Sequence, residues 1–242
     1  MEQVLGRAGG APYGRRAYLL PVHPLGHLGL VGCKDSGEAG KTYVVQGNLS
    51  GKRRSYGELL GCLEKMCQRG GKAASFRLVL AGAPVKEDPP PVGPCVGQRL
   101  VQKHELGYRE FYAELASAHF VVTATATDLY EWDRATSSVP TALILERPLV
   151  ASSSLLAAYP CLRPKGGSGG GGVDAEAPVH ARVANDDLCQ AVEAAQALTP
   201  REYDEMEVEA RRCKFRAWGE ARRTLARAAA GWELPQAPLP AG

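Results

Sequence analysis

Residues 42–69, TYVVQGNLSGKRRSYGELLGCLEKMCQR, change their pattern of apolar residues halfway along. The first six, TYVVQG, are mostly β-branched, aromatic or apolar, which is typical of a short buried strand. From residue 56 onward the apolar residues recur three or four apart, as on one face of a helix. That face is formed by Leu59, Leu60, Leu63, Met66 and Cys67. Ser55 and Glu58 stand three apart, as in a capping box, so the stretch predicts a strand, a loop and a capped helix.

The same alternation continues along the chain. Further strands are predicted at 76–82, 99–104, 119–124 and 148–152. Further helices are predicted at 108–118, 137–146, 185–198 and 200–229, the last after a second capping box, Thr199 to Glu202. Such alternation is typical of a parallel sheet with helices on both faces. We therefore expect an α/β fold with a doubly wound, mainly parallel, Rossmann-like sheet of five or six strands and a long C-terminal helix.

Glycine-rich and proline-rich stretches divide the chain into parts. Residues 1–41 show no sustained period and are interpreted as a tail or an interdomain linker. Residues 42–230 form the predicted domain, interrupted at 165–172 by KGGSGGGG, a composition typical of a flexible insertion. Residues 231–242 are predicted to be a disordered tail.

Composition excludes several classes of protein. The 29 basic and 26 acidic side chains give a net charge of +3, too balanced to indicate a nucleic-acid partner. The longest apolar stretch, 141–160, contains Glu146 and Arg147, which is incompatible with a membrane span. No basic and apolar leader opens the chain. We therefore expect a soluble chain located in the cytoplasm.

The seven cysteines are an odd number with no CxxC pair. Disulfide and metal interpretations are therefore weak, and we expect reduced thiols packed in the core, with no metal site. These residues are Cys33, Cys62, Cys67, Cys95, Cys161, Cys189 and Cys213.

The triplet Gly40-Lys41-Thr42 matches the end of a phosphate-binding P-loop. That motif requires a further glycine five residues before Gly40 and a helix directly after the triplet. Asp35 stands in the place of that glycine, and a strand is predicted from residue 42. A P-loop NTPase is therefore the weakest of the alternatives, and we expect Lys41 not to line a phosphate site.

Two other loops carry groups that suit phosphate. Lys52, Arg53 and Arg54 stand between a predicted strand and a capped helix, where guanidinium groups can hold a diphosphate; a solvated surface run is the alternative. The second loop follows the strand at 119–124, and its small hydroxyls could hold phosphate or ribose oxygens, with ordinary helix capping as the alternative. The candidate residues, which precede or open the next predicted helix, are Asp133, Thr136, Ser137, Ser138 and Thr141.

The order of four segments resembles the C-terminal, donor-binding half of the GT-B glycosyltransferases, most closely the retaining enzymes of the family 1 and family 4 type. The segments are YVVQGNLSGKRRSYGELLGCLEK, FRLVLAG, HELGYREFYAELASAHFVVTA and SSVPTALILERPLVAS. The resemblance covers about residues 42–230. It implies that Gly47, Asn48, Arg53 and Arg54 grip the diphosphate of a nucleotide-sugar.

The resemblance also assigns roles to the second loop. ERPLVAS is similar to the family's G-x-P-V-V segment, upstream of which two glutamates contact the sugar and the ribose. Asp133 and Thr141 take their places here, so Asp133 is expected to bind a sugar hydroxyl. Ser137, Ser138 and Thr141 are expected to hold phosphate or ribose oxygens.

The function that the resemblance implies is transfer of a sugar from a nucleotide-sugar of the UDP or GDP type to an acceptor. No cofactor and no metal is expected, because cations take the metal's place beside the diphosphate. A partner half that binds the acceptor is expected to be missing from this chain. The alternative is a non-catalytic module with a decayed nucleotide-sugar site, which would bind other proteins through the helix at 200–229.

Overall fold

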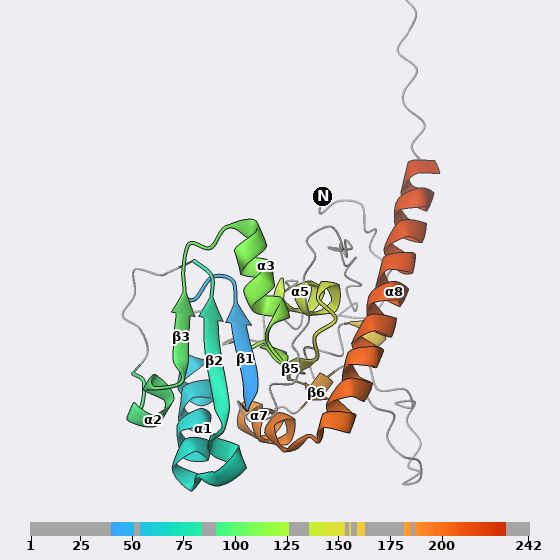
Figure 1. The fold of residues 1–242 in the computed structure, drawn as a ribbon. Coiled ribbons are helices and arrows are strands. Elements are labelled where there is room, and N and C mark those ends of the chain that lie inside the picture. The colour runs from blue at the N-terminus through green and yellow to red at the C-terminus, as the bar shows by residue number, and fades with distance from the viewer. Residues whose placement is uncertain are drawn as a thin grey trace, which may run out of the picture.

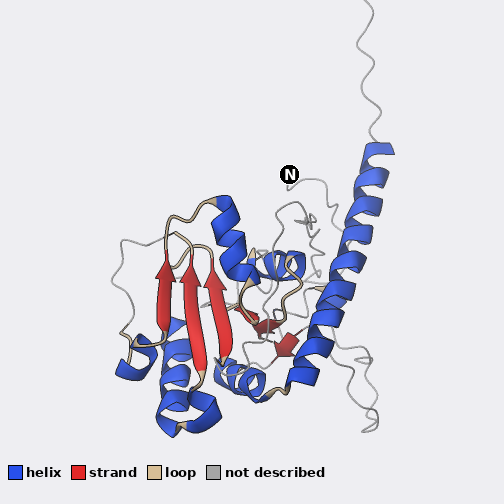
Figure 2. Ribbon diagram, viewed as in Figure 1, coloured by secondary structure: helices blue, strands red, loops and turns tan. Residues whose placement is uncertain are grey.

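The computed structural model describes residues 40–50, 54–83, 91–125, 136–152, 155, 159–162, 182–184 and 187–230. Six strands form one sheet in the order β3-β2-β1-β4-β5-β6, and every pair of neighbours is parallel. Figure 2 shows the strands with helices on both sides. The strands are β1 (Lys41–Gln46), β2 (Phe76–Ala81), β3 (Leu100–Lys103), β4 (Phe120–Val122), β5 (Leu149–Ala151) and β6 (Arg182–Ala184). The predicted doubly wound, Rossmann-like α/β fold is confirmed.

The α-helices cover both faces of this sheet (Figure 1). They are α1 (Tyr56–Arg69), α2 (Pro94–Gly97), α3 (Tyr108–Ala116), α5 (Ser138–Ile144), α7 (Leu188–Ala197) and α8 (Pro200–Ala230), with short 3-10 turns η2 (Gly71–Ala74) and η3 (Pro160–Leu162). Alternate residues of β1 enter two cores: Tyr43 and Val45 pack with α1 and α7, whereas Val44 packs with α3 and α5. The long helix α8 contributes to both, with Met206 in the first core and Cys213 in the second.

The strand order places a topological switch point between β1 and β4. From β1 the chain proceeds outward through β2 and β3, then returns to the other side of β1 and proceeds through β4, β5 and β6. The loops that leave β1 and β4 therefore diverge at the carboxyl ends of these strands. In open α/β sheets this is the place where ligands bind.

The two predicted capping boxes differ. Before α8, Glu202 accepts from the backbone N–H of Thr199 at 2.7 Å, and the Thr199 hydroxyl accepts from Glu202 N–H at 3.3 Å, so this box is confirmed. Before α1, the Ser55 hydroxyl instead donates to the Glu58 carboxylate, and no side chain caps the helix backbone. Glu58 also accepts from Leu188 N–H at 3.1 Å, so a contact between α1 and α7 replaces the predicted local box.

The expectation of reduced core thiols is wrong. Three disulfides join the six cysteines that the structure describes: Cys62–Cys189, Cys67–Cys95 and Cys161–Cys213. They link α1 to α7, α1 to α2, and η3 to α8. The pairs are 127, 28 and 52 residues apart in sequence, so local spacing gave no sign of them.

Several predictions concern the termini and the insertion. Residues 1–39 of the predicted tail or linker at 1–41, including Cys33, lie outside the described residues, as do the insertion at 165–172 and the tail at 231–242. Lys41, which the sequence pattern assigns to the tail, is instead the first residue of β1. Among the helices that are described, none is both long and apolar enough to cross a membrane.

Candidate functional site

The end of β1 makes a close approach to the end of β2. Gly47 follows β1 with φ of 101°, a backbone conformation that favours glycine, and its N–H donates to Ala81 O at 2.9 Å. Gly82 follows β2, and a Cβ on Gly82 would overlap the carbonyl group of Gly47. Gly47 is therefore favoured by its backbone conformation, and Gly82 is required for the close approach of the two loops that follow β1 and β2.

Arg54 folds back over this loop. Its Nη2 donates to Gln46 O at 2.6 Å and its Nε to Asn48 O at 3.5 Å. The backbone of Arg54 forms an isolated bridge with Thr125, just beyond β4, and Ser55 N–H donates to Ala124 O at 3.1 Å. The cation and the start of α1 are thus fixed across the carboxyl ends of β1 and β4.

The serines that precede and open α5 reach the same place. Gln46, the last residue of β1, donates from Nε2 to Ser137 Oγ at 3.2 Å and to Ser138 Oγ at 3.4 Å. A Cβ on Gly47 would lie 3.3 Å from Arg54 Nη2 and 3.9 Å from Ser137 Oγ. Ser137 is exposed, whereas Ser138 is fully buried. We call Gln46, Gly47, Arg54, Ser137 and Ser138 the switch-point cluster.

The structure thus brings together part of the predicted site. Gly47, Asn48, Arg54, Ser137 and Ser138 lie on one edge of the sheet, as expected for loops that follow parallel strands. Thr141 lies about one turn into α5 and is buried, with 6% of its surface exposed. Arg53 and Asp133 lie outside the described residues.

Two members of this region were not predicted from sequence. Gln46 reads as a strand residue, but it is buried and its amide holds both serines. Tyr56 reads as a helix-core residue, yet its buried hydroxyl has no hydrogen-bond partner among the described residues. Burial raises the pKa of Tyr56 to about 12, opposed by the charge of Arg54, so the hydroxyl stays protonated and can donate. The signal that could have found Tyr56 is an aromatic hydroxyl two residues after a run of cations.

Replacing Tyr56 with phenylalanine tests whether this hydroxyl serves a ligand. We expect unchanged or higher thermal stability, because an unpartnered buried hydroxyl costs about 1–3 kcal/mol. We also expect threefold to tenfold weaker UDP binding in calorimetry, roughly the loss of one neutral hydrogen bond.

Tyr43→Phe is the matched control, because the Tyr43 hydroxyl donates to Gln196 at 2.8 Å, away from the cluster. It should lower stability and leave UDP affinity unchanged. Equal UDP affinity of the wild type and Tyr56→Phe would exclude the hydroxyl from the site.

Lys41 lies at the opposite, amino edge of the sheet. Its Nζ donates to the carbonyl oxygens of Ala195 at 2.7 Å, Gln196 at 3.1 Å and Leu198 at 2.6 Å. A lysine ammonium suits the C-terminal carbonyls of a helix, which carry partial negative charge. Lys41 therefore caps the C-terminus of α7, and Lys41 and Thr42 are the first residues of strand β1, so the triplet does not form a P-loop.

Replacing Lys41 with alanine should lower the free energy of unfolding by about 1.5–3 kcal/mol, the usual contribution of hydrogen bonds from a charged donor. Nucleotide affinity should stay within about 0.5 kcal/mol of the wild type. Chemical denaturation and calorimetry measure the two effects, with the exposed Lys72→Ala as control. A tenfold loss of affinity at normal stability would restore the P-loop interpretation.

The fold matches solved structures of GT-B glycosyltransferases. An α,α-trehalose-phosphate synthase (UDP-forming) from Burkholderia xenovorans, in complex with glucose-6-phosphate, has a TM-score of 0.53 at 11% identity, over 80% of this chain and 44% of the synthase. An E. coli trehalose-6-phosphate structure bound with UDP-2-fluoro glucose has a TM-score of 0.53 at 9% identity, over 81% of this chain and 45% of the other. No protein-family model and no curated protein sequence matches the chain.

At this identity the similarity shows a shared fold. The resemblance to GT-B glycosyltransferases expected from the sequence is confirmed at that level. The chain spans less than half the length of these two proteins.

Proposed function

We propose that the chain binds a nucleoside diphosphate sugar, of the UDP or GDP type, at the β1–β4 switch point and serves as the donor-binding part of a glycosyltransferase. One observation carries this proposal. A guanidinium, a glycine backbone and a serine hydroxyl meet at the carboxyl ends of β1 and β4, with Arg54 Nη2 and Ser137 Oγ both within 4 Å of a Cβ built on Gly47. This combination suits the oxygens of a diphosphate.

Arg54 has the main electrostatic role in this proposal. When the bond between the sugar and the diphosphate breaks, its electron pair goes to a diphosphate oxygen, and negative charge develops there. A guanidinium already held by two backbone carbonyls is positioned to stabilise that charge without reorganising. By the resemblance, Arg53 adds a second cation.

The hydroxyls of the two serines have different roles. Ser137 is exposed and can donate to a phosphate oxygen, whereas Ser138 is buried and, through Gln46, holds the end of β1 against α5. Asp133 would accept from a sugar hydroxyl, and Thr141 would face the ribose, both by the resemblance alone. The acceptor would enter from a second Rossmann-like half, which we propose as the partner of this domain.

A calorimetry panel tests the proposal: UDP, GDP, ADP and inorganic pyrophosphate against the purified chain. We expect UDP or GDP to bind and pyrophosphate to bind more weakly, because the base and ribose add contacts. No binding of any nucleotide would refute the proposed function. Equal binding of pyrophosphate and all three nucleotides would reduce the site to a general anion site.

A further inference from the structure

The six described cysteines form three cross-links that between them hold helices on both faces of the sheet. Cys62–Cys189 and Cys67–Cys95 join helices of the face covered by α1 and α7. Cys161–Cys213 joins η3 to α8 in the core on the other face. Every described cysteine is paired with another. Reduced thiols packed in a core would have no reason to lie in such pairs.

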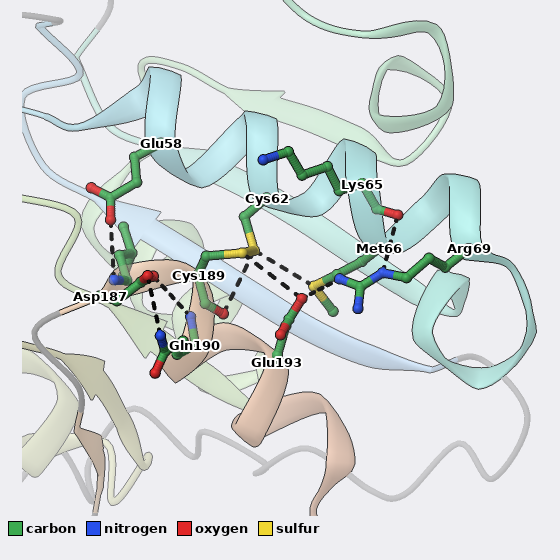
Figure 3. The surroundings of a disulfide bond; sticks show 10 residues. Glu58, Cys62, Lys65, Met66, Arg69, Asp187, Cys189, Gln190 and Glu193 are labelled. Carbon is green, nitrogen blue, oxygen red and sulfur yellow. Dashed lines mark hydrogen bonds and ion pairs between the residues drawn. A yellow bond between two sulfur atoms is a disulfide. The ribbon is translucent and has the colours of Figure 1, made fainter.

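The seam between α1 and α7 brings Cys62 and Cys189 together independently of their bond (Figure 3). At one end Glu58 accepts from Leu188 N–H at 3.1 Å, and at the other Arg69 forms an ion pair with Glu193. Cys62 lies between them and is 3% exposed. The two thiols therefore meet in the folded protein, where Cys62 is buried and Cys189 is half-buried.

Cys62, Cys189 and Glu193 could also be considered as ligands of a metal ion, since their ligand atoms lie within 4.8 Å of one another. Two features favour the cystine. The Glu193 carboxylate is engaged by the Arg69 guanidinium, which would repel a cation, and a disulfide leaves no thiolate to bind one.

We propose that the protein folds and acts in an oxidising compartment, where the three cystines are permanent parts of the fold. In the cytosol the glutathione and thioredoxin systems keep most protein thiols reduced. Each cystine forms by thiol–disulfide exchange: two thiols give up two protons and two electrons, and a disulfide oxidant is reduced to two thiols. This location replaces the cytoplasmic one expected from the sequence.

The cystines also have a positional role. Cys161 precedes the glycine-rich stretch 165–172 and is tied to α8, whereas Cys189 follows it and is tied to α1. Two disulfides therefore join the chain before the glycine-rich stretch to the chain after it. The cystines hold β6, α7 and α8 to the rest of the domain even when the glycine-rich stretch is cut.

A cleavage experiment tests this pairing. A specific protease site is placed within 165–172 of the full chain carrying Cys33→Ser, and the folded protein is cut and run on a denaturing gel. We expect the fragments to remain joined without reductant and to separate with it. Separation without reductant would overturn the proposal.

Matched double variants identify the cross-links. Cys62→Ser with Cys161→Ser should release the fragments without reductant, because it removes both links across the cut. Cys67→Ser with Cys95→Ser should leave them joined, because that pair lies within the N-terminal fragment. Peptide mapping of the uncut protein under non-reducing conditions gives the same answer without any cysteine substitution, and pairs other than the three would overturn the assignment.

The compartment is tested by alkylating thiols at the moment of lysis in the cells that make the protein. We expect six cysteines to be protected from alkylation by their disulfides and Cys33 alone to be alkylated. Seven reactive thiols, or stoichiometric zinc in the purified protein, would overturn the proposal. Neither result bears on nucleotide binding, so this proposal and the proposed function can fail separately.

Discussion

Replacing Gly82 with alanine is expected to destabilise the domain by at least about 2 kcal/mol and to abolish measurable UDP or GDP binding. The added Cβ would overlap the Gly47 carbonyl, so the ends of β1 and β2 must separate. Overpacking and backbone strain each cost about 1–3 kcal/mol. Because Gly47 lies between Arg54 and Ser137, the same displacement separates the groups proposed to hold the diphosphate.

Chemical denaturation and calorimetry measure these two losses. Gly57→Ala and Gly61→Ala in α1 are matched controls, because a Cβ at either position meets nothing within 4 Å. They should stabilise the domain by roughly 0.5–1 kcal/mol, the usual gain from replacing glycine in a helix. A Gly82→Ala protein that behaves like these controls would show that the close approach of the two loops has no role.

Replacing both Arg53 and Arg54 with alanine is expected to weaken UDP or GDP binding at least tenfold. Charge-assisted hydrogen bonds contribute about 1.5–3 kcal/mol each, and Arg54 is already held over the loop by the Gln46 and Asn48 carbonyls. Circular dichroism should show an intact fold, because Arg54 belongs to neither hydrophobic core and its side chain donates to backbone carbonyls at the end of β1 and in the loop after it.

Arg222→Ala with Arg223→Ala is the control, since it removes the same charge from an adjacent exposed pair on α8. That variant should bind UDP and GDP like the wild type. Equal losses in the two double variants would mean that net charge, rather than the switch-point cluster, attracts the nucleotide.

The fold was predictable because its signals are local. The run of β-branched, aromatic and apolar residues in TYVVQG and the helical period that follows depend on residues a few positions apart, and they predicted the bounds of β1 and α1 to within a residue or two. The parallel order of the strands then placed the Gly47 and Ser137 loops on one edge. The fold therefore follows from the periodicity of the sequence, and the shared position of the two loops follows from the geometry of parallel sheets.

The missed features depend on contacts distant in sequence. Lys41 binds carbonyls 154 to 157 residues away, and Cys62 pairs with a residue 127 positions away. Glu58 fits a local capping box in sequence, but in the structure it contacts the start of α7. Tyr56 carried the right periodicity for a core residue, and its unpartnered hydroxyl becomes visible only once its neighbours are placed.

Backbone amide chemical shifts of the isotopically labelled protein, recorded with and without saturating UDP, test the switch-point site most directly. We expect the largest changes at Gly47, Arg54 and Ser137, at the carboxyl ends of β1 and β4. Lys41 and Ser75, at the amino edge of the sheet, should remain unshifted. Largest changes at the amino edge or along α8, with Gly47 and Ser137 unaffected, would contradict a nucleotide site at the switch point.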